Sequence, residues 1–561
     1  MRVDPSRVQA LTEDMVRIES IVATPGEASI GRWVFQRLRS LPYFRSEPDH
    51  LELIKTKDDE HERYLVLALV KGRAVSDSVA PQDTVVLFGH TDTVGTGDFG
   101  PLKPWALEPR ELAGRLAGLP GLAGEVREDL ESGEWLFGRG SLDMKAGVAA
   151  HMALVEYLSS RTERMAGNVL FLATPDEEDM SHGILTARDR MGQLAREQGL
   201  RYVAAINADY TSPLYPGDPS RYVYLGSVGK VLPSFFIAGK ETHVGQPFEG
   251  FDPNLVAAEL TRLIDLNPEL ADEGLGEVAA PPVSLKMADL KDVYTVQTPV
   301  AAYAYYNFFT HSKSPEEVLH LMLEVGRRAF QDALDLMESR RLAYCQKAGI
   351  PAGPCPWKVR VSSWEEFRGG LALRHGTAFE DAMSTLAKAM LEDPSIDLRV
   401  FSRRMVEEAW AWSEDKSPCA VLYFSSAFSP RVVLTGARPG ERRLMEAVSR
   451  AVNSLHDQIA WPVAVRNFFP YISDMSLLAM SEDEDSIACL ARNMPAWGGK
   501  YTFDPRPVLD LDVPVINVGT YGKDAHKMTE RVHMPYTFQV LPELTLRIVE
   551  QLVGFEEALS G

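Results

Sequence analysis

The apolar residues in the N-terminal part of the chain alternate between helix-like and strand-like stretches. Apolar side chains recur at helical spacing over residues 6–41, where Pro25 and Gly26 interrupt the pattern. Helical spacing returns after Asp143 and again near 183–198. Short apolar runs predict buried strands over 63–70, 84–89, 168–174 and 202–208. Because these strands alternate with helices, the pattern predicts βαβ units and a mainly parallel sheet.

The pattern changes near residue 213, where Pro213, Pro216, Gly217 and Pro219 form a cluster of turn residues. Beyond it the predicted elements are paired strands over 222–238, helices over 254–266 and 315–343, and strands over 299–309 and 358–361. Two helices and a few strands in that order predict a small antiparallel α+β domain. We expect this domain to span 221–364.

The last part of the chain is expected to return to the first domain. Its predicted elements are helices over 376–392, 400–412, 441–455 and 542–553, and strands over 420–425 and 513–519. The predicted fold class is therefore α/β, in which 1–220 and 365–561 form a mainly parallel-sheet domain around the insertion. The stretch 96–133, rich in Gly, Pro and Leu, is expected to be a surface segment with short helices.

Length, charge and cysteine usage narrow the class of protein. The 561 residues favour at least two domains. A formal net charge of −21 repels nucleic acid and anionic membranes, so neither is expected as a partner. No apolar run approaches the ~20 residues of a membrane span, and no apolar signal core follows the N-terminus. The four cysteines are widely spaced without a C-x-x-C pair, which predicts a cytoplasmic protein with ordinary thiols.

Acidic and histidine residues gather just past the predicted strands. They are His90, Asp92, Asp143, Glu177, Glu178 and Asp209, with His526 in a further segment near the end. Open α/β sheets bind their ligands outside the carboxyl ends of the strands. Carboxylates buried together there would repel each other at high cost, and a pair of divalent cations would remove that cost. The sequence therefore predicts a two-metal hydrolytic centre.

The first two motifs each have a functional and a purely structural interpretation. His90 and Asp92 are two residues apart, so they share one face of a strand. This spacing suits a metal-bound His90 whose tautomer Asp92 fixes, although a polar turn after a strand has the same spacing. Asp143 follows Gly140 and Ser141 at a helix start, where it would either cap the helix or bridge two cations.

The other motifs indicate a metal site only when all the motifs are considered together. Glu177 and Glu178 follow strand 168–174, where an acidic surface loop is the simpler interpretation. The alternative has Glu178 on a metal and Glu177 accepting a proton from a metal-activated water. Asp209 would otherwise be a strand terminus and His526 a loop histidine. Five further histidines have no such setting and are interpreted as structural: His151, His182, His311, His456 and His533.

Taken in order, these segments resemble the M20 family of metallopeptidases and amidohydrolases. The boxes that carry the resemblance are His90-Thr91-Asp92-Thr93-Val94, Gly140-Ser141-Leu142-Asp143-Met144-Lys145-Ala146-Gly147, Asp176-Glu177-Glu178 and Ala525-His526-Lys527-Met528-Thr529-Glu530. The resemblance covers 6–245 and 440–555. It implies a catalytic domain of zinc-exopeptidase type with an inserted lid domain.

The resemblance also implies specific roles. The implied ligands are His90, Asp143 and Asp209 for one zinc ion, and Asp143, Glu178 and His526 for the other. Cobalt and manganese are alternative metals, and Glu177 would be the general base. The implied lid corresponds to 221–364 and often mediates dimerisation in the family, so a homodimer through the lid is expected.

One lid motif extends the resemblance, and one departs from it. The box Gly239-Lys240-Glu241-Thr242-His243-Val244-Gly245-Gln246-Pro247 implies that His243 stabilises the oxyanion, commonly in a neighbouring subunit's active site. Many members have D-x-R where this chain has Tyr306-Asn307-Phe308. The chain is also longer than typical members, by 96–133 and 366–430. In its length and its Tyr-Asn-Phe-Phe-Thr strand it is most similar to the RocB type, a subfamily associated with arginine utilisation.

The expected function is hydrolysis of an amide or peptide bond in a small amino-acid-derived substrate, such as a peptide or an N-acyl amino acid. A different class remains open, in which the same fold serves a catalytically silent binding protein. The intact set of five ligands together with Glu177 favours the enzyme, because a silent protein need not retain them all. A one-metal enzyme is a third interpretation.

Overall fold

The chain folds into two compact units, which a computed structural model describes over residues 2–555. The first unit comprises Met1–Ser227, Val432–Met480 and Arg506–Gly561. The second unit comprises Val228–Arg431 and Ser481–Pro505. Each unit has a sheet and helices of its own, as expected for a chain too long for a single hydrophobic core.

The first unit is built on an eight-stranded sheet in the order β1-β2-β5-β3-β6-β17-β7-β16. Its strands are β1 (Leu51–Lys55), β2 (Tyr64–Lys71), β3 (Asp83–His90), β5 (Asn168–Thr174), β6 (Arg201–Asn207), β7 (Arg221–Tyr224), β16 (Val463–Arg466) and β17 (Val515–Asn517). β3 pairs in parallel with both β5 and β6, and β6 pairs in parallel with β17. The outer pairs β1–β2 and β2–β5 are antiparallel. The predicted α/β class is confirmed, with the parallel part at the centre of a mixed sheet.

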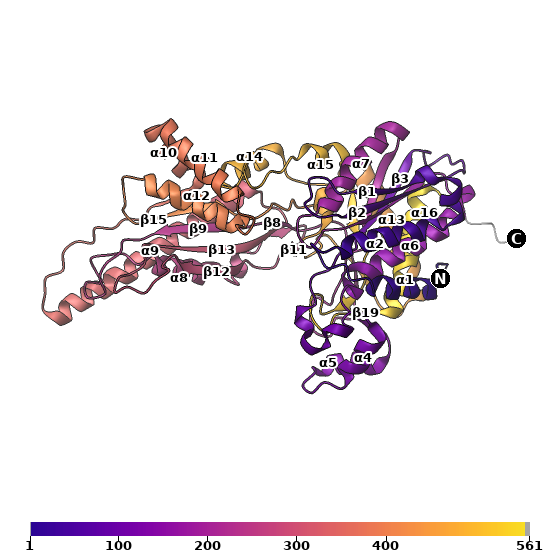
Figure 1. The fold of residues 1–561 in the computed structure, drawn as a ribbon, viewed down its shortest axis with the longest axis horizontal. Helices are drawn as coiled ribbons and strands as arrows, with labels where there is room; N and C mark the ends of the chain where they lie inside the picture. The colour runs from indigo at the N-terminus through magenta and orange to yellow at the C-terminus, as the bar shows by residue number, and fades with distance from the viewer. Residues whose placement is uncertain (1, 556–561) are drawn as a thin grey trace. The chain divides into compact units, whose positions relative to one another are not determined.

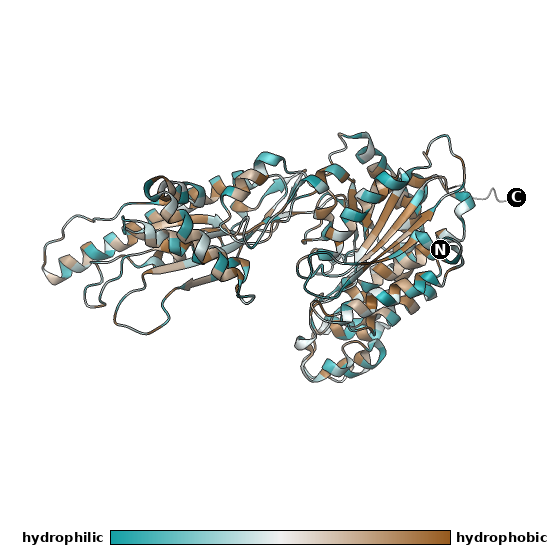
Figure 2. Cartoon of the chain, turned by 45° about the horizontal axis from the view of Figure 1, so that its top comes forward, coloured by the Kyte–Doolittle hydropathy of each residue, from teal (hydrophilic) through white to brown (hydrophobic). Residues whose placement is uncertain are grey.

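Helices cover both faces of this sheet (Figure 1). They are α1 (Pro5–Val16), α2 (Gly26–Arg39), α3 (Pro42–Ser46), α6 (Ala146–Ser159), α7 (His182–Gln198), α13 (Pro439–Leu455), α15 (Arg506–Leu511) and α16 (Leu541–Val553). Successive side chains of a strand point to opposite faces. Val85 and Leu87 of β3 therefore join one hydrophobic cluster, with α1, α2, α6, α13 and α16. Val86 and Phe88 join another, with α7. Figure 2 shows the resulting hydrophobic strands.

A short helical segment in the first unit corresponds to the predicted surface segment 96–133. It contains the 3-10 turns of Gly97–Trp105, α4 (Pro109–Ala117) and α5 (Gly124–Ser132). Its apolar residues form a separate cluster that includes Phe99, Leu112 and Leu116. Beside it lies a three-stranded sheet of β18 (Gly522–Lys523), β19 (Arg531–His533) and β4 (Trp135–Phe137).

The second unit has its own sheet in the order β12-β13-β9-β15-β14, with β8 paired to β13. Its strands are β8 (Gly229–Val231), β9 (Pro233–Ala238), β12 (Val283–Asp289), β13 (Ala301–Thr310), β14 (Val361–Ser363) and β15 (Cys419–Phe424), with a small hairpin of β10 (Glu273–Gly274) and β11 (Glu277–Val278). Its helices are α8 (Pro253–Ile264), α9 (Pro315–Ala348), α10 (Trp364–His375), α11 (Thr377–Leu391), α12 (Leu398–Trp412) and α14 (Glu484–Arg492). Figure 1 shows α8 and α9 on one side of this sheet and α10–α12 on the other.

The units divide the chain differently from the predicted domains. Residues 221–227 belong to the first unit because β7 pairs with β16 and β17, so 222–238 is not one set of paired strands. Residues 365–431 belong to the second unit because β15 pairs with β9 in that unit's sheet. The stretch 481–505 belongs there too. An amphipathic pattern shows that a helix buries one face, but not which sheet it covers.

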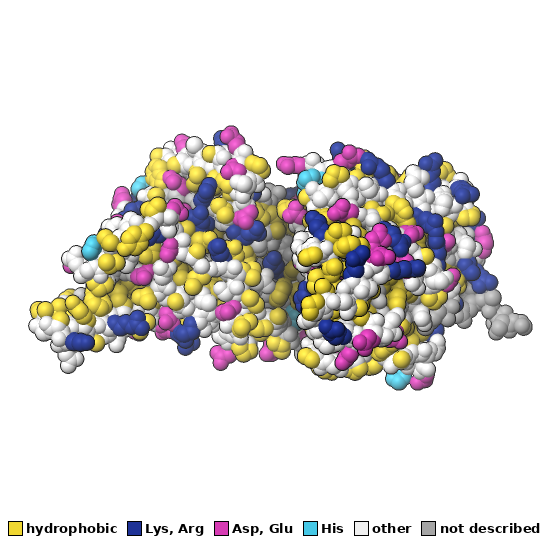
Figure 3. Space-filling view, turned by 60° about the horizontal axis from the view of Figure 1, so that its bottom comes forward, with side chains coloured by type: hydrophobic (Ala, Val, Ile, Leu, Met, Phe, Trp, Pro, Cys, Tyr) yellow, Lys and Arg dark blue, Asp and Glu magenta, His cyan; other side chains and the backbone are white. Residues whose placement is uncertain are grey.

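Three further features bear on the expectations from composition. No helix within residues 2–555 is both long and apolar enough to cross a membrane. The four cysteines are free thiols, and three of them are buried. On the face shown in Figure 3, acidic and basic side chains are interspersed among hydrophobic ones.

Candidate metal centre

The centre of the first unit's sheet brings the predicted motifs to one edge. His90 is the last residue of β3 and is in register with Thr174 at the end of β5. Glu177 and Glu178 follow β5, and Asp209 follows β6 on the other side of β3. Because these strands are parallel, their carboxyl ends coincide.

Asp143 lies between the two histidines. One of its carboxylate oxygens, Oδ1, is 3.0 Å from His90 Nε2, and the other, Oδ2, is 3.0 Å from His526 Nε2. His526 Nε2 is also 2.9 Å from Glu178 Oε1. One ligand atom from each of His90, Asp143 and Glu178 lies within 4.8 Å of the others. A single carboxylate thus faces two histidines that are more than 430 positions apart in the sequence.

Burial and charge shift the pKa values of these groups strongly. Burial raises the pKa of Asp143, but hydrogen bonds from His526 and His90 outweigh it and hold the pKa below its usual range. Hydrogen bonds to Asp143 and Glu178 raise the pKa of His526 to about 10. Burial, with the negative charge of Asp143, raises the pKa of Asp209 to about 8. The cluster therefore favours positive charge on its histidines and opposes full ionisation of its carboxyl groups.

Asp92 fixes the position of its neighbours rather than facing Asp143. Its carboxylate accepts hydrogen bonds from the backbone N–H groups of Glu177, at 3.2 Å, and Glu178, at 3.1 Å. Its Oδ1 is 3.5 Å from His90 Nδ1. The buried Asp92 carboxylate thus holds the acidic loop after β5 and lies beside the ring of His90, whose Nδ1 is also 3.2 Å from the Asp92 carbonyl oxygen.

The donor set suits a divalent metal. Imidazole nitrogen and carboxylate oxygen are ligands that zinc accepts in proteins. Four of the five predicted ligands are close together, and the fifth, Asp209, is near enough for the charges of Asp143 and Glu178 to raise its pKa. His90, Asp143 and Asp209 are each less than 7% exposed, so a cation would meet little competition from water.

His243 belongs to the second unit, whereas the other candidate residues belong to the first. It lies in the loop after β9 and pairs with Gln297 through a single β-bridge. The side chain is exposed, and its Nδ1 accepts a hydrogen bond from the Gly245 N–H at 3.0 Å. Its role remains a prediction.

Glu530 has no predicted role, although it ends the box that contains His526. Its Oε1 accepts hydrogen bonds from the N–H groups of Leu142, at 3.2 Å, and Asp143, at 3.4 Å. Its Oε2 accepts a hydrogen bond from Arg139 Nη1 at 2.7 Å. All of these contacts are buried, so Glu530 fixes the backbone at Asp143. The fixed spacing from His526 was the available signal.

Asp474 was also missed. It begins a short 3-10 turn, Asp474–Leu477, that Asn207 holds at the end of β6 through a hydrogen bond to Ser473. Burial raises the pKa of Asp474 to about 7, although the Ser181 hydroxyl and the charge of His90 act in the opposite direction. No motif spacing marks this residue, because it reaches the site only through the fold.

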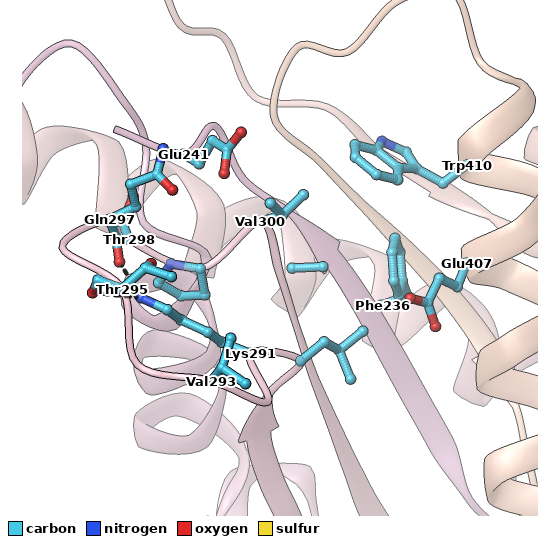
Figure 4. A pocket seen from close by; sticks show the side chains of 13 residues that line it. Phe236, Glu241, Lys291, Val293, Thr295, Gln297, Thr298, Val300, Glu407 and Trp410 are labelled. Atoms are coloured by element: carbon cyan, nitrogen blue, oxygen red, sulfur yellow. Dashed lines mark hydrogen bonds between the residues drawn. The ribbon is translucent and has the colours of Figure 1, made fainter. Parts of the chain in front are cut away.

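A separate cavity of about 260 Å³ lies in the second unit, between the loop 290–300 and α12 (Figure 4). Phe236 and Trp410 line one side of it, and Lys291, Val293 and Thr295 line the other. It contains none of the candidate ligands. The lining offers no group of acidic and histidine side chains comparable to the centre in the first unit.

Known proteins resemble this chain over nearly its whole length. Protein RocB of Bacillus subtilis (strain 168) is 35% identical over 538 residues, which cover 96% of this chain and 93% of RocB. The uncharacterized protein YqjN of the same organism is 32% identical over 550 residues, 98% of this chain and 97% of YqjN. In fold, aminopeptidase PepT from Bacillus cereus matches with a TM-score of 0.53 and 12% identity, over 98% of this chain and all of that one.

The family of this chain follows from a match to a family model. The model of peptidase family M20/M25/M40 matches residues 86–478, well over half of the chain. The match begins within β3 and includes the motifs of His90, Asp143, Glu178 and Asp209. Together with the identity to RocB over almost the full length, this match shows that the chain belongs to peptidase family M20/M25/M40.

Proposed function

We propose that this chain is a two-metal hydrolase that cleaves an amide or peptide bond in a small amino-acid-derived substrate. The observation that carries the proposal is the position of Asp143, whose two oxygens each face a different histidine at 3.0 Å. A carboxylate in that position suits a bridge between two cations. A helix cap, the simpler interpretation of this residue, would instead accept a hydrogen bond from the backbone of its own helix, and Asp143 makes none.

The proposed ligand sets follow the family resemblance, and the contacts among His90, Asp143, Glu178 and His526 support them. We assign His90, Asp143 and Asp209 to one ion, and Asp143, Glu178 and His526 to the other. Zinc fits this mixture of nitrogen and oxygen ligands, with cobalt or manganese as alternatives. When bound, such ions lower the pKa of a water molecule and polarise a carbonyl oxygen.

Glu177 is the proposed general base. Its Oε2 is 4.0 Å from His90 Nε2, whereas Glu178 reaches His526, so the adjacent glutamates face different parts of the centre. Burial, with the negative charges of Asp474 and Asp209, raises the pKa of Glu177 well above its usual range. A carboxylate with a raised pKa accepts a proton from the attacking water more readily. It can then return that proton to the nitrogen that leaves.

Asp92 supports both sides of this arrangement. By accepting the N–H groups of Glu177 and Glu178, it fixes the base and one ligand together. Its second role is to keep the Nε2 of His90 turned toward Asp143. We propose it as a positioning residue for catalysis.

The proposed substrate class is based on the family of the chain and on its expected role in arginine utilisation. Membership of a peptidase family supports an amide or peptide bond as the target. We propose dipeptides and N-acyl amino acids as the substrates to test. We propose a role in arginine utilisation, which the similarity to RocB supports through the association of the RocB type with that process, and arginine-containing dipeptides and N-acyl arginines are therefore the first substrates to test.

Metal content and a substrate screen test the proposal together. Elemental analysis of the purified protein should find close to two equivalents of a divalent metal per chain, falling after His526→Ala. Hydrolysis of at least one dipeptide or N-acyl amino acid should be lost on chelation and restored by zinc, cobalt or manganese. A protein that binds metal but hydrolyses none of these compounds would support the catalytically silent alternative. A protein with no metal affinity would contradict the proposal.

A further inference from the structure

The loop that carries His526 connects β18 to β19 and has an unfavourable backbone conformation. Asp524 and His526 both have positive φ angles, 60° and 64°, which residues other than glycine seldom adopt. His526 itself is about half exposed, with 45% of its side chain accessible. The loop therefore depends on contacts elsewhere to hold this side chain toward Asp143 and Glu178.

Arg531 provides the contact inside the loop. Its Nη1 donates to Asp524 Oδ2 at 2.5 Å and to the Thr529 carbonyl at 3.0 Å. Asp524 also accepts hydrogen bonds from Lys527 Nζ and from the Thr529 hydroxyl. The Arg531 side chain is completely buried, so carboxylate and carbonyl oxygens, and not water, balance its positive charge.

The second carboxylate on Arg531 comes from α5, in the segment 96–133. Asp129 Oδ2 accepts a hydrogen bond from Arg531 Nε at 2.7 Å. The same oxygen accepts one from Lys523 Nζ at 2.9 Å. Lys523 belongs to β18 and Arg531 to β19, so Asp129 links the two strands on either side of the His526 loop.

The segment also makes an apolar contact with the loop and a polar contact near Asp143. Met528, two residues after His526, packs against the cluster of Phe99, Leu112 and Leu116. Asp98 accepts a hydrogen bond from Arg139 Nη2 at 2.7 Å, while Arg139 Nη1 binds Glu530. Glu530 in turn holds the backbone of Asp143. The segment therefore supports both chain stretches that bring Asp143 and His526 together.

We propose that the segment 96–133 positions the metal-binding loop of His526, and that Asp129 is the positioning residue through which it acts. The inference rests on the proposed two-metal centre, in which His526 binds one ion and not the other. Loss of the Asp129 carboxylate frees one side of Arg531 and Lys523, and the loop then holds His526 less firmly. Outer contacts of this kind typically change metal affinity by about 10- to 100-fold.

The chain provides a matched control on the same helix. Glu125, one turn before Asp129, contacts Lys523 Nζ at 2.7 Å, but its side chain is 63% exposed. Exposed pairs contribute little. The test is a zinc titration of metal-free protein against a chromophoric chelator, which reports the two affinities without any assay of activity. The proteins compared are wild type, Asp129→Asn, Glu125→Gln, His526→Ala and the Asp129→Asn/His526→Ala double variant.

We expect wild type and Glu125→Gln to show the same two affinities. Asp129→Asn should weaken one of them by about 10- to 100-fold and leave the other within twofold. In the His526→Ala background the same substitution should have no further effect, which a general loss of folding stability would not produce. Unchanged affinities in Asp129→Asn, or an equal effect in both backgrounds, would overturn the proposal.

A second variant covers the case in which Asp129→Asn does not fold. Lys523→Met removes one of the two cations that Asp129 holds while leaving Arg531 paired, and it should weaken the same affinity and not the other. An unchanged pair of affinities in Lys523→Met would then overturn the proposal. If wild type binds no zinc, or if His526→Ala retains both affinities, the two-metal centre itself fails. If His526→Ala loses one affinity and Asp129→Asn loses none, only the positioning role fails.

Discussion

At the scale of single residues, adjacent glutamates differ in what they contact. Glu178 Oε1 is 2.9 Å from His526, whereas Glu177 approaches His90 only to 4.0 Å. We predict that Glu177→Gln keeps the metal content of the wild type but lowers kcat by ~10²–10⁴-fold, the usual cost of losing a general base. Elemental analysis and kcat on a verified substrate measure the two effects separately.

Glu178→Gln is the matched control for this prediction. It changes the same chemical group one position along, but on a proposed ligand, so it should lower the metal content as well as the activity. Near-normal hydrolysis by Glu177→Gln would show that another group takes the proton. Loss of metal from Glu177→Gln would show that this residue is a ligand instead.

His151 lies within α6, and burial lowers its pKa to about 3, although the Phe88 carbonyl favours the charged form. The folded protein keeps this ring neutral between pH 3 and 6.5, while the unfolded chain takes up a proton below about 6.5. Stability is therefore lost as the pH falls through this range. At about 1.4 kcal/mol per pH unit, His151 alone lowers the free energy of unfolding by about 2 kcal/mol between pH 6.5 and 5.

We predict that His151→Leu removes this part of the acid sensitivity. Urea unfolding at pH 7 and pH 5 should show a smaller loss of stability for His151→Leu than for the wild type. His456→Gln, at a histidine whose side chain is 80% exposed, is the control for replacing a histidine at the surface. An equal loss of stability in His151→Leu and wild type would mean that other groups cause the acid sensitivity.

At the scale of elements, strongly periodic stretches could be predicted and weakly patterned ones could not. β3, β5 and β6 are fully or largely buried apolar runs, and the candidate site lies at their carboxyl ends. β12 was missed because most of its side chains are exposed, so it has no continuous apolar run. β7 was assigned to the wrong unit because a four-residue strand carries no information about its partner.

Within residues 2–555, β12 pairs only with β13, so it is an edge strand of the second unit. Val283, Leu285 and Met287 are all exposed on it. An unpaired edge with exposed apolar side chains is a site where another chain can pair. We therefore propose this edge as the contact of the expected homodimer.

We predict that Leu285→Lys shifts a wild-type dimer toward monomer, because a charge on the edge opposes pairing. Light scattering over a range of concentrations measures the shift. Lys286→Gln, at an exposed charged position on the same strand, should leave the dimer intact. A wild-type protein that is monomeric at all concentrations would rule out the dimer, and a dimer unaffected by Leu285→Lys would place the contact elsewhere.

At the scale of the whole molecule, the candidate site is assembled from distant parts of the chain. From the ligand types and their order in the sequence it was possible to predict that His90, Asp143, Glu178 and His526 lie close together. The supporting residues were not predictable in the same way. Asp474 reaches the site through a 3-10 turn, and Asp129 acts from a helix with no motif of its own. Such contacts depend on tertiary packing, which periodicity does not encode.

His243 belongs to the second unit, whereas every proposed ligand belongs to the first. Its exposed ring, with Nδ1 accepting the Gly245 N–H, leaves Nε2 to donate a hydrogen bond. We propose that it donates to the oxyanion that forms when water attacks the scissile carbonyl. Losing such a donor costs roughly 2.7–4 kcal/mol of barrier, so His243→Ala should lower kcat by about 10²–10³-fold and keep the metal content.

Mixing two inactive variants then shows which subunit supplies the histidine. In a dimer whose histidine acts across the subunits, a heterodimer of His243→Ala and Glu177→Gln contains one site with both residues intact. Activity should therefore return on mixing, approaching one quarter of the wild-type value at equal amounts, because about half of random dimers are mixed and each has one working site. If the histidine acts within its own chain, both sites of the mixed dimer lack one group and mixing restores nothing. Full activity in His243→Ala alone would show that the oxyanion is stabilised by another group.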